Sequence, residues 1–322
     1  MKNTLKTLSM LLVLSVAVCS LAACSKKVIE YETSASRTTP SSESLSSELV
    51  SSEEISSEEA SSDNLSSNTS SEEKPRPITE IERLFGKETY DYLTSLSNKS
   101  TGWGQGVNYN DKNRPTACVN LEKSYAKYDA LTIMPEEMKV YITIDEGYEY
   151  NNNTAKMLDI LKEKDVQAVF FVTLSYAKKN PELIKRFINE GHIIGNHSSN
   201  HPEYPTLSLD EAYADAMKLH NYIKETYNYE MTLFRFPSGT HSEQMMALMQ
   251  KMGYKTLFWS YAYKDWETAN QPDPADSLAK LTERLHPGAL YLIHAVSDTN
   301  VAILGDFIDN IRAAGYDISN EY

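Results

Sequence analysis

Short apolar runs alternate with amphipathic segments over the second half of the chain. The runs have the length and composition of buried parallel strands and occupy 140–144, 166–173, 192–195, 231–236, 254–259 and 289–294. Segments with the apolar spacing of helices lie between them, at 154–164, 181–190, 209–226, 242–252, 277–285 and 301–314. Gly191, Gly253 and Gly315 stand where helix C-terminal caps belong. The alternation predicts one α/β domain with a parallel sheet, either open or closed into a barrel.

The chain ahead of residue 139 follows other patterns. A helical spacing of apolar residues begins at Ile78 and fades at Ser97, and an irregular stretch rich in Gly, Asn and Pro follows it. Further upstream, Ser-Ser pairs begin at positions 41, 46, 51, 56, 61 and 66, and most are followed by Glu or Asp. This repeat lacks aromatic residues and has almost no large apolar side chains, so it cannot offset the entropy cost of ordering. We expect a disordered Ser/Glu-rich linker over 24–77 that acts as a solvated spacer.

The first residues have the features of an export signal. Lys2 and Lys6 precede an apolar run at 10–18, which has the length of a signal-peptide core and is shorter than the ~20 residues that span a bilayer. The sequence Leu-Ala-Ala-Cys that ends at Cys24 resembles the lipobox of bacterial lipoproteins. That resemblance implies cleavage before Cys24 and a diacylglycerol on its thiol, which would anchor the protein to the outer face of the bacterial cell membrane. An ordinary signal peptide cut near Ala23, or an uncleaved anchor, remains the alternative.

Charge and cysteine content exclude two classes of protein. The 322 residues contain 31 Lys and Arg against 45 Asp and Glu, a formal net charge of −14. Such a chain has no means of neutralising a row of phosphates, so we expect no nucleic-acid partner. Of the three cysteines, Cys19 and Cys24 lie in the export segment, which excludes a disulfide framework. We expect Cys118 to be an inert buried thiol.

Polar groups follow the predicted strands at their C-terminal ends, where the chemistry of parallel α/β sheets is located. They are Asp145 and Glu146 after the first strand, His197 and His201 after the third, Arg235 after the fourth, Asp265 after the fifth and His294 at the end of the sixth. Two histidines four residues apart can face one divalent cation, and a carboxylate from another strand would complete three protein ligands with a position left for water. An adjacent carboxylate can serve as the base beside that water. The arrangement favours a catalytic metal site over a closed structural one.

These motifs resemble those of carbohydrate esterases of the polysaccharide deacetylase type, which contain a NodB-homology domain. The resemblance covers about 139–318 and includes five motifs in order. Thr-Ile-Asp-Glu-Gly-Tyr-Glu at 143–149, Gly-Asn-His-Ser at 195–198, Lys-Asp-Trp at 264–266 and His-Pro-Gly-Ala at 286–289 are most similar to the branch that makes muramic δ-lactam in peptidoglycan. The resemblance implies a distorted (β/α)7 barrel.

The same branch has an N-terminal extension that resembles the surroundings of Trp103 and Gly104. We therefore predict four segments in the chain: a lipoprotein signal peptide at 1–23, the linker at 24–77, an extension packing on the barrel at 78–138 and the deacetylase domain at 139–322.

The resemblance implies a hydrolytic role for individual residues. Asp145 would be the general base that takes a proton from the attacking water, and Arg235 would orient it through an ion pair. His197 and His201 would hold a divalent metal ion, expected to be Zn, with Mn or Co as alternatives. Glu146 stands where most relatives have a metal-binding Asp, and its extra methylene leaves open whether it ligates, binds weakly or leaves the ion to the histidines and solvent.

Further residues are implied on the leaving-group and substrate side. His294 would be the general acid that protonates the leaving amine. Many relatives tune this histidine with an Asp at the position of Ala262, and Asp265, also counted as substrate-binding, is the candidate to replace it. Trp266 and Leu292 would form the walls of the acetyl pocket. The backbone N–H near Ser238 would face the oxyanion, and Gly239 beside it is grouped with the substrate-binding residues. His241, which follows the arginine motif, is a candidate sugar contact.

The sequence therefore predicts an extracytoplasmic, lipid-anchored, metal-dependent enzyme that deacetylates N-acetylmuramic acid in peptidoglycan and leads to muramic δ-lactam. Its partners would be the glycan strand and, through Cys24, the membrane, and we expect a monomer. One alternative is a deacetylase of N-acetylglucosamine in peptidoglycan or another polysaccharide. Another is a catalytically inactive glycan-binding lipoprotein, which Glu146 and Ala262 motivate.

Overall fold

The computed structural model describes residues 76–322. The predicted signal peptide, the lipidation site at Cys24 and nearly all of the predicted linker lie outside the described residues. The described part forms one compact unit. None of its helices combines the length and apolar character that a bilayer crossing requires.

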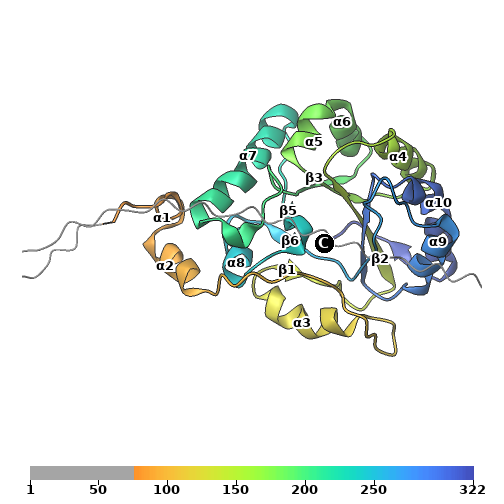
Figure 1. Ribbon diagram of the computed structural model, residues 1–322, viewed down its shortest axis with the longest axis horizontal. Coiled ribbons are helices and arrows are strands. Elements are labelled where there is room, and N and C mark those ends of the chain that lie inside the picture. Colours follow the sequence, from red (N-terminus) through yellow and green to blue (C-terminus); the bar gives the residue numbers. More distant parts are fainter. Residues whose placement is uncertain (1–75) are drawn as a thin grey trace, which may run out of the picture. The chain divides into compact units, whose positions relative to one another are not determined.

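A single parallel sheet forms the centre of the molecule (Figure 1). Within residues 76–322 it contains nine strands: β1 (Ala130–Leu131), β2 (Lys139–Glu146), β3 (Val169–Val172), β4 (Ile193–Asn196), β5 (Leu233–Phe234), β6 (Lys255–Leu257), β7 (Tyr261–Ala262), β8 (Ala289–His294) and β9 (Asp317–Ile318). Their order is β1-β6-β5-β4-β3-β2-β8-β7, and β9 pairs with the start of β2. Among the described strands, β1 and β7 at the two ends do not pair, so the sheet is a curled, incompletely closed barrel.

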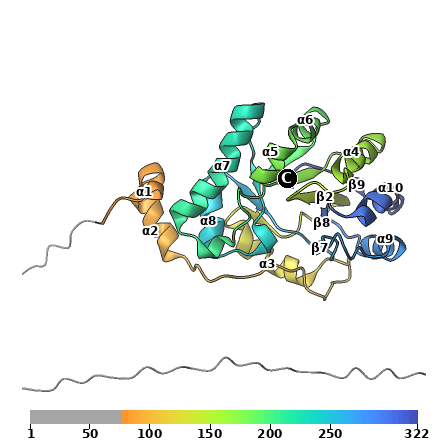
Figure 2. The same cartoon turned by 45° about the horizontal axis from the view of Figure 1, so that its top comes forward.

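The helices lie on the outer side of the curled sheet, where the first two in the chain pack against the seventh and eighth (Figures 1 and 2). They are α1 (Glu80–Phe85), α2 (Lys87–Ser95), α3 (Thr116–Ala126), α4 (Asn153–Glu163), α5 (Leu174–Lys179), α6 (Pro181–Asn189), α7 (Leu209–Tyr227), α8 (Glu243–Lys251), α9 (Pro274–Glu283) and α10 (Asp298–Ala313). Side-chain caps start several of them, including a full capping box between Ser208 and Glu211 at the beginning of α7. This α/β arrangement is the fold class that the sequence predicts.

The segment 78–138 is built into this unit. Its strand β1 pairs in parallel with β6. The Asp210 carboxylate on α7 accepts hydrogen bonds from the backbone N–H groups of Glu80 and Ile81 at the start of α1, over 3.0 and 2.9 Å. Residues on both sides of position 139 therefore contribute strands to the same sheet. The domain boundary at 139 stays a prediction.

The side-chain alternation of β2 determines what reaches the inside of the barrel. Val140, Ile142 and Ile144 pack in the large core beneath the helices, whereas Tyr141 packs in a separate inner cluster. Because successive side chains of a strand point to opposite faces, Asp145 shares the inner face with Tyr141. In register, Asp145 stands beside Phe171 of β3 and His294 of β8. The C-terminal ends of three strands therefore meet around this aspartate.

Candidate active site

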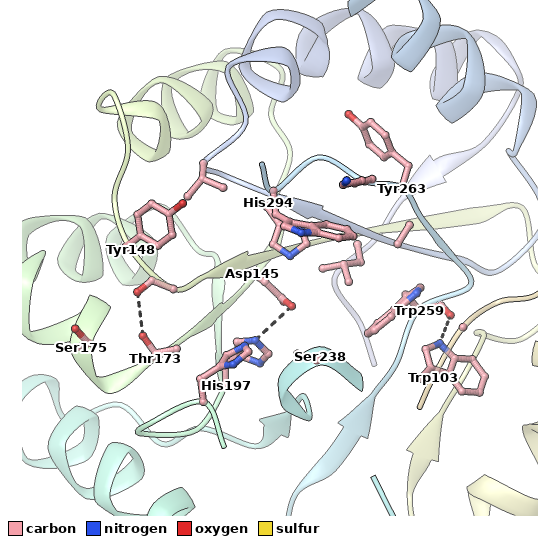
Figure 3. A pocket seen from close by; sticks show the side chains of 18 of the residues that line it. Trp103, Asp145, Tyr148, Thr173, Ser175, His197, Ser238, Trp259, Tyr263 and His294 are labelled. Carbon is pink, nitrogen blue, oxygen red and sulfur yellow. Dashed lines mark hydrogen bonds and ion pairs between the residues drawn. The ribbon is translucent and has the colours of Figure 1, made fainter. Parts of the chain in front are cut away.

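A cavity of about 1090 Å³ lies at the C-terminal ends of the strands (Figure 3). It brings together most of the residues that the sequence singled out. The predicted residues that line it are Asp145, His197, His201, Ser238, Trp266, Leu292 and His294. Side chains scattered over 150 residues of the primary sequence thus share one hollow.

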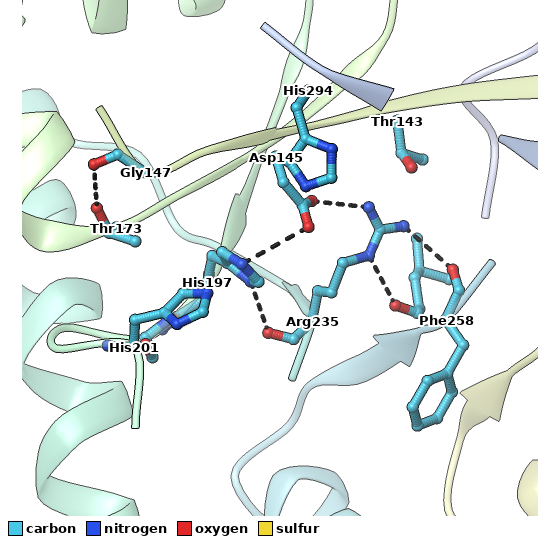
Figure 4. Close-up of polar contacts among 12 residues, drawn as sticks. Thr143, Asp145, Gly147, Thr173, His197, His201, Arg235, Phe258 and His294 are labelled. Atoms are coloured by element: carbon cyan, nitrogen blue, oxygen red, sulfur yellow. Dashed lines mark hydrogen bonds and ion pairs between the residues drawn. The ribbon is translucent and has the colours of Figure 1, made fainter. Parts of the chain in front are cut away.

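The Asp145 carboxylate is held by a buried arginine beneath the cavity (Figure 4). Arg235 donates from Nη1 to Asp145 Oδ1 over 2.8 Å, from Nε to the Leu257 carbonyl over 3.0 Å and from Nη2 to the Phe258 carbonyl over 3.1 Å. Its guanidinium also lies 4.1 Å from the centre of the Phe171 ring. Burial by itself would raise the pKa of Asp145, but the charges of Arg235 and His197 hold it below its ordinary value. Asp145 is therefore ionised and fixed in direction.

The second oxygen of Asp145 faces the first histidine of the pair. His197 Nε2 lies 3.6 Å from Asp145 Oδ2, and His197 Nδ1 lies 3.0 Å from the Arg235 carbonyl. Because a carbonyl only accepts, Nδ1 carries the proton and Nε2 of the neutral ring keeps a free lone pair. Burial lowers the pKa of His197 to about 4, which keeps the ring neutral near pH 7. This is the form in which an imidazole ligates a metal ion.

The loop from 197 to 201 places the second histidine beside the first. The two rings are 5.1 Å apart between centroids, and both line the cavity. Ser198 and His201 have positive φ angles of 72° and 55°, a conformation that costs energy for residues other than glycine. The Asp215 carboxylate on α7 stabilises the loop by accepting from the Ser199 N–H and the Asn200 side chain.

The donor groups fit a divalent cation in chemistry. Two imidazoles and the Asp145 carboxylate face one cavity, and Zn²⁺, Mn²⁺ and Co²⁺ all accept nitrogen and oxygen ligands. Within residues 76–322, no three side chains of His, Cys, Asp or Glu are already arranged as a closed ligand set. The described residues therefore supply nitrogen and oxygen ligands of the kind that these cations bind. The free lone pair on Nε2 of the neutral His197 ring is the best defined of them.

The structure corrects the expectation for Glu146. Its side chain is fully buried on the opposite face of β2 from Asp145 and does not line the cavity. Both carboxyl oxygens accept from Thr154 Oγ1 of α4, over 3.2 and 3.4 Å. Burial, together with the charge of Glu149, raises the pKa of Glu146 well above its ordinary value. Two consecutive strand residues cannot both face the inside of the barrel. Glu146 therefore does not reach the cavity to serve as a metal ligand beside His197 and His201.

A second carboxylate supports the histidine across the cavity. The Asp265 side chain is fully buried; its Oδ1 accepts from His294 Nδ1 over 2.7 Å, and its Oδ2 accepts from the His294 backbone N–H over 2.9 Å. Asn300 Nδ2 also donates to Oδ2, over 2.6 Å. Burial would lower the pKa of His294, but the hydrogen bond and charge of Asp265 outweigh it and raise that pKa. His294 is therefore suited to carry and release a proton.

Asp265 is thus corrected from a substrate-binding residue to the support of His294, because it lies behind that ring and does not line the cavity. Its position three residues after Ala262 gave the sequence its only indication of this role. Asn300, which completes the arrangement from α10, carried no sequence signal.

Aromatic and apolar side chains form the walls. Trp266 is half exposed, and its ring centroid lies 5.6 Å from that of His294. Tyr148 is also half exposed and lines the same cavity. Leu292 is buried below them. The extension adds a wall that the sequence indicated only through Trp103, whose Nε1 donates to the Trp259 carbonyl over 2.9 Å (Figure 3).

The turn after Arg235 brings Ser238 to the cavity. Ser238 lines it with φ 54° and ψ 11°, and its N–H has no hydrogen-bond acceptor among residues 76–322. Gly239 does not line the cavity, which corrects its place among the substrate-binding residues. A Cβ at Gly239 would lie 2.7 Å from Trp259 Cη2 and 2.9 Å from Trp103 Cβ, so glycine is required there by packing.

Comparison with known proteins agrees with this geometry. A family model described as polysaccharide deacetylase matches residues 133–257. The chain is 37% identical over 226 residues to the peptidoglycan-N-acetylmuramic acid deacetylase PdaA of Bacillus subtilis, covering 69% of this chain and 84% of that protein. The chain belongs to the polysaccharide deacetylase family.

A solved structure and a second relative illustrate the range of the similarity. The solved structure of Bacillus subtilis PdaA, described as a family 4 carbohydrate esterase, matches with a TM-score of 0.66 and 35% identity over 70% of this chain and 96% of that one. The peptidoglycan-N-acetylglucosamine deacetylase PgdA of Listeria monocytogenes is 31% identical over 180 residues, which cover 56% of this chain and 37% of that protein. Relatives with two different sugar specificities are therefore similar to this chain.

The polysaccharide deacetylase model ends at residue 257, ahead of Asp265 and His294. Asp145, both histidines of the 197–201 loop and Arg235 fall inside it. The pairing of β8 with β2 is what brings His294 to Asp145. The two halves of the site are therefore joined by sheet topology.

Proposed function

We propose that this polysaccharide deacetylase hydrolyses the N-acetyl group of N-acetylmuramic acid residues in peptidoglycan, as a step toward muramic δ-lactam. The observation that carries the proposal is the pairing of two supported acid-base groups across one cavity. Asp145, ionised beside Arg235, faces His294, whose pKa is raised by Asp265. A base and an acid with separated proton affinities are what amide hydrolysis requires.

The protein groups divide the reaction between them. Asp145 takes a proton from a water molecule while the oxygen of that water forms a bond to the acetyl carbon. The Ser238 amide, which has no acceptor within residues 76–322, donates to the oxyanion that develops on the carbonyl oxygen. The carbon–nitrogen bond then breaks, and His294 gives its proton to the departing nitrogen. The products are acetate and a free amine on the sugar.

A divalent cation would be held by His197 and His201, with Zn²⁺ expected and Mn²⁺ or Co²⁺ as alternatives. When bound, it would polarise the acetyl carbonyl and increase the acidity of a nearby water molecule. The Nδ1–H of His197, held by the Arg235 carbonyl, supports this by keeping Nε2 free. Direct metal analysis of the purified protein, with His197→Ala and His201→Ala as variants, tests this part; equal metal content in all three would contradict it.

The muramic specificity is supported by the relative PdaA and by the branch motifs at 143–149 and 264–266. Lactam closure needs the lactyl carboxylate free to meet the new amine, so the expected substrate is a muramic residue without its stem peptide. Purified peptidoglycan, with and without amidase treatment, should release acetate only or chiefly after treatment. Mass spectrometry of the muropeptides should then locate the lost acetyl on muramate.

Deacetylation of N-acetylglucosamine is the second candidate, and the similarity to PgdA of Listeria monocytogenes favours it. Acetyl loss from glucosamine in the same mass spectra would support this candidate and contradict the muramic one. For the inactive glycan-binding alternative, Asp265 takes the supporting position that Ala262 leaves open, whereas Glu146 stays outside the cavity. Acetate release by the wild type would contradict this alternative.

We further propose that Cys24 carries a lipid that anchors the chain to the outer face of the cell membrane, and that the protein acts as a monomer. The lipobox-like sequence before Cys24 supports the anchor. Labelling of cells with a radioactive fatty acid should mark the wild type and leave a Cys24→Ala variant unlabelled. Release of both proteins into the medium would contradict the anchor.

A further inference from the structure

A buried histidine outside the cavity holds the turn that carries the Ser238 amide. The His241 Nδ1 atom lies 2.9 Å from the Gly239 carbonyl oxygen, and its Nε2 lies 2.7 Å from the Tyr125 hydroxyl. The carbonyl can only accept, so Nδ1 carries the proton and Nε2 accepts from the tyrosine hydroxyl. Burial lowers the pKa of His241, which is consistent with a neutral ring in this tautomer. The hydrogen bonds therefore run in one direction, from Tyr125 through His241 to Gly239.

The turn needs such support because two successive residues adopt left-handed conformations. Ser238 has φ 54° and Gly239 has φ 68°. Glycine adopts this region freely, whereas serine does not. Backbone bonds from the Gly239 N–H to the Phe236 carbonyl and from the Thr240 N–H to the Pro237 carbonyl, each 3.0 Å, close the turn from within. These two bonds do not determine how the turn is oriented relative to the cavity. That orientation depends on contacts with residues outside the turn.

Those outside contacts come from the segment ahead of the first long strand. Thr101 and His241 exchange two backbone hydrogen bonds of 2.9 Å, and Tyr125 belongs to α3. Trp103 packs so closely on Gly239 that a Cβ there would lie 2.9 Å from its own Cβ. His241 itself is buried and does not line the catalytic cavity, which corrects the expectation that it contacts sugar.

We propose that Tyr125 and His241 are positioning residues of the deacetylation reaction: by holding the Gly239 carbonyl they aim the preceding Ser238 amide at the developing oxyanion. This inference rests on the proposed function. A donor that is correctly aimed stabilises the transition state more than the bound substrate. Its misalignment should therefore lower kcat and leave KM nearly unchanged.

Three substitutions in the full-length protein separate this role from packing. Tyr125→Phe removes the hydroxyl that donates to His241 Nε2. His241→Asn keeps an N–H at the position of Nδ1, whereas His241→Gln places its amide at the position of Nε2 and loses the bond to Gly239. Tyr128→Phe is the matched control, because the Tyr128 hydroxyl donates to Glu243 and is not part of the hydrogen bonds from Tyr125 through His241 to Gly239.

Acetate release from peptidoglycan is measured for each variant, with Tm alongside. We expect His241→Gln to lower kcat by about 10- to 100-fold, since complete removal of an oxyanion donor costs roughly 100- to 1000-fold. Tyr125→Phe should lower it several-fold, His241→Asn should retain most of the activity, and Tyr128→Phe should match the wild type. KM should stay within about twofold throughout.

The inference is overturned if folded His241→Gln and Tyr125→Phe proteins keep the wild-type kcat. It is equally overturned if His241→Asn falls as far as His241→Gln, since the loss would then follow the ring shape and not the donor. A variant that does not fold is excluded by its Tm, and Tyr125→Phe, which deletes one oxygen, then decides alone. If the wild-type protein releases no acetate, the proposed function itself is contradicted. The positioning role is tested separately, by comparing the turnover of the variants with that of an active wild type.

Discussion

At the scale of single residues, the site depends on one buried ion pair beneath the cavity. Arg235 is completely buried and supplies the positive charge that keeps Asp145 ionised. Because the folded-state pKa of Asp145 is depressed, its contribution to stability is present above the ordinary pKa of an aspartate and is lost as the pH falls through the lowered value. Removing the arginine leaves an unpaired buried carboxylate, which is far more costly than losing a surface pair.

Arg235→Met should therefore lower acetate release by more than about 100-fold and destabilise the protein by about 3–5 kcal/mol. Chemical denaturation monitored by circular dichroism measures the second effect. Arg83→Met, which removes an exposed pair with Glu80, is the control and should change the stability little, because solvent screens that pair. Equal stability losses in the two variants would contradict the structural importance of the buried pair.

The pair on the other side of the cavity controls a pH limit. In the proposed mechanism His294 must be protonated to act as the acid, and its raised pKa keeps it protonated to higher pH than an ordinary histidine. Activity should therefore fall as the pH rises through that raised value. Asp265→Asn removes the charge that opposes the effect of burial, so the alkaline limb of the kcat/KM profile should move to lower pH. The exposed Asp276→Asn variant should leave the limb in place, and an unmoved limb in Asp265→Asn would contradict the assignment.

At the scale of elements, long buried runs were predictable and short strands were not. The run at 289–294 matches β8, whereas β5 is only Leu233–Phe234 within a predicted 231–236. The strands β1, β7 and β9, of two residues each, leave no periodic signal. Sheet pairing with partners far along the chain, and not local pattern, creates them.

Helix boundaries, in contrast to the short strands, depend on local chemistry. The single helical pattern that begins at Ile78 divides into α1 and α2 at Gly86, which has φ 85°. The helix α5, directly after β3, was missed because its apolar residues continue the strand run at 166–173. Thr173 caps it by accepting from the Tyr176 N–H, a signal that the adjoining apolar run concealed.

The 197–201 loop gives an element-scale prediction. The Asp215 carboxylate accepts from Ser199, Asn200 and the Tyr204 hydroxyl, so it determines the conformation in which His201 reaches the cavity. Asp215→Ala leaves three donors without this acceptor and should cost about 1–3 kcal/mol, with acetate release reduced at least about tenfold.

Chemical denaturation and an acetate assay measure these two effects. The matched control is Asp159→Ala, at an exposed aspartate paired with Arg186, which should change both quantities little. Wild-type activity in the Asp215→Ala variant would show that the loop keeps its shape without this carboxylate.

At the scale of the whole molecule, residues ahead of 139 complete the catalytic domain. The segment 78–138 supplies β1 and the wall at Trp103, and it buries Ile81, Leu93 and Cys118 completely. A fragment of residues 76–322 should therefore keep the wild-type Tm and turnover on soluble glycan. A fragment of 133–322, the family match carried to the C-terminus, should fail to fold cooperatively. Thermal melts and acetate assays test both, and an active, folded 133–322 fragment would contradict this role of the extension.

The sequence predicted the chemistry of the site better than its spatial order. Asp145, His197 and His294 were recognisable because they follow strands, and parallel strands bring their C-terminal ends together. Glu146 was misplaced because adjacency in sequence does not mean a shared face on a strand. Asn300 and Tyr125 were unpredictable in their roles, since they act on neighbours more than 30 residues away through folding alone.

The most direct test is acetate release from amidase-treated peptidoglycan by the wild type and by Asp145→Asn, assayed with and without Zn²⁺, Mn²⁺ or Co²⁺. The Asp and Asn side chains are nearly the same size, so the substitution removes the proposed base while the cavity keeps its shape. We predict release by the wild type, with acetyl lost from muramate, and a fall of at least about 1000-fold in the variant. Equal turnover by the two proteins, or no release by the wild type with any of the cations, would contradict the account.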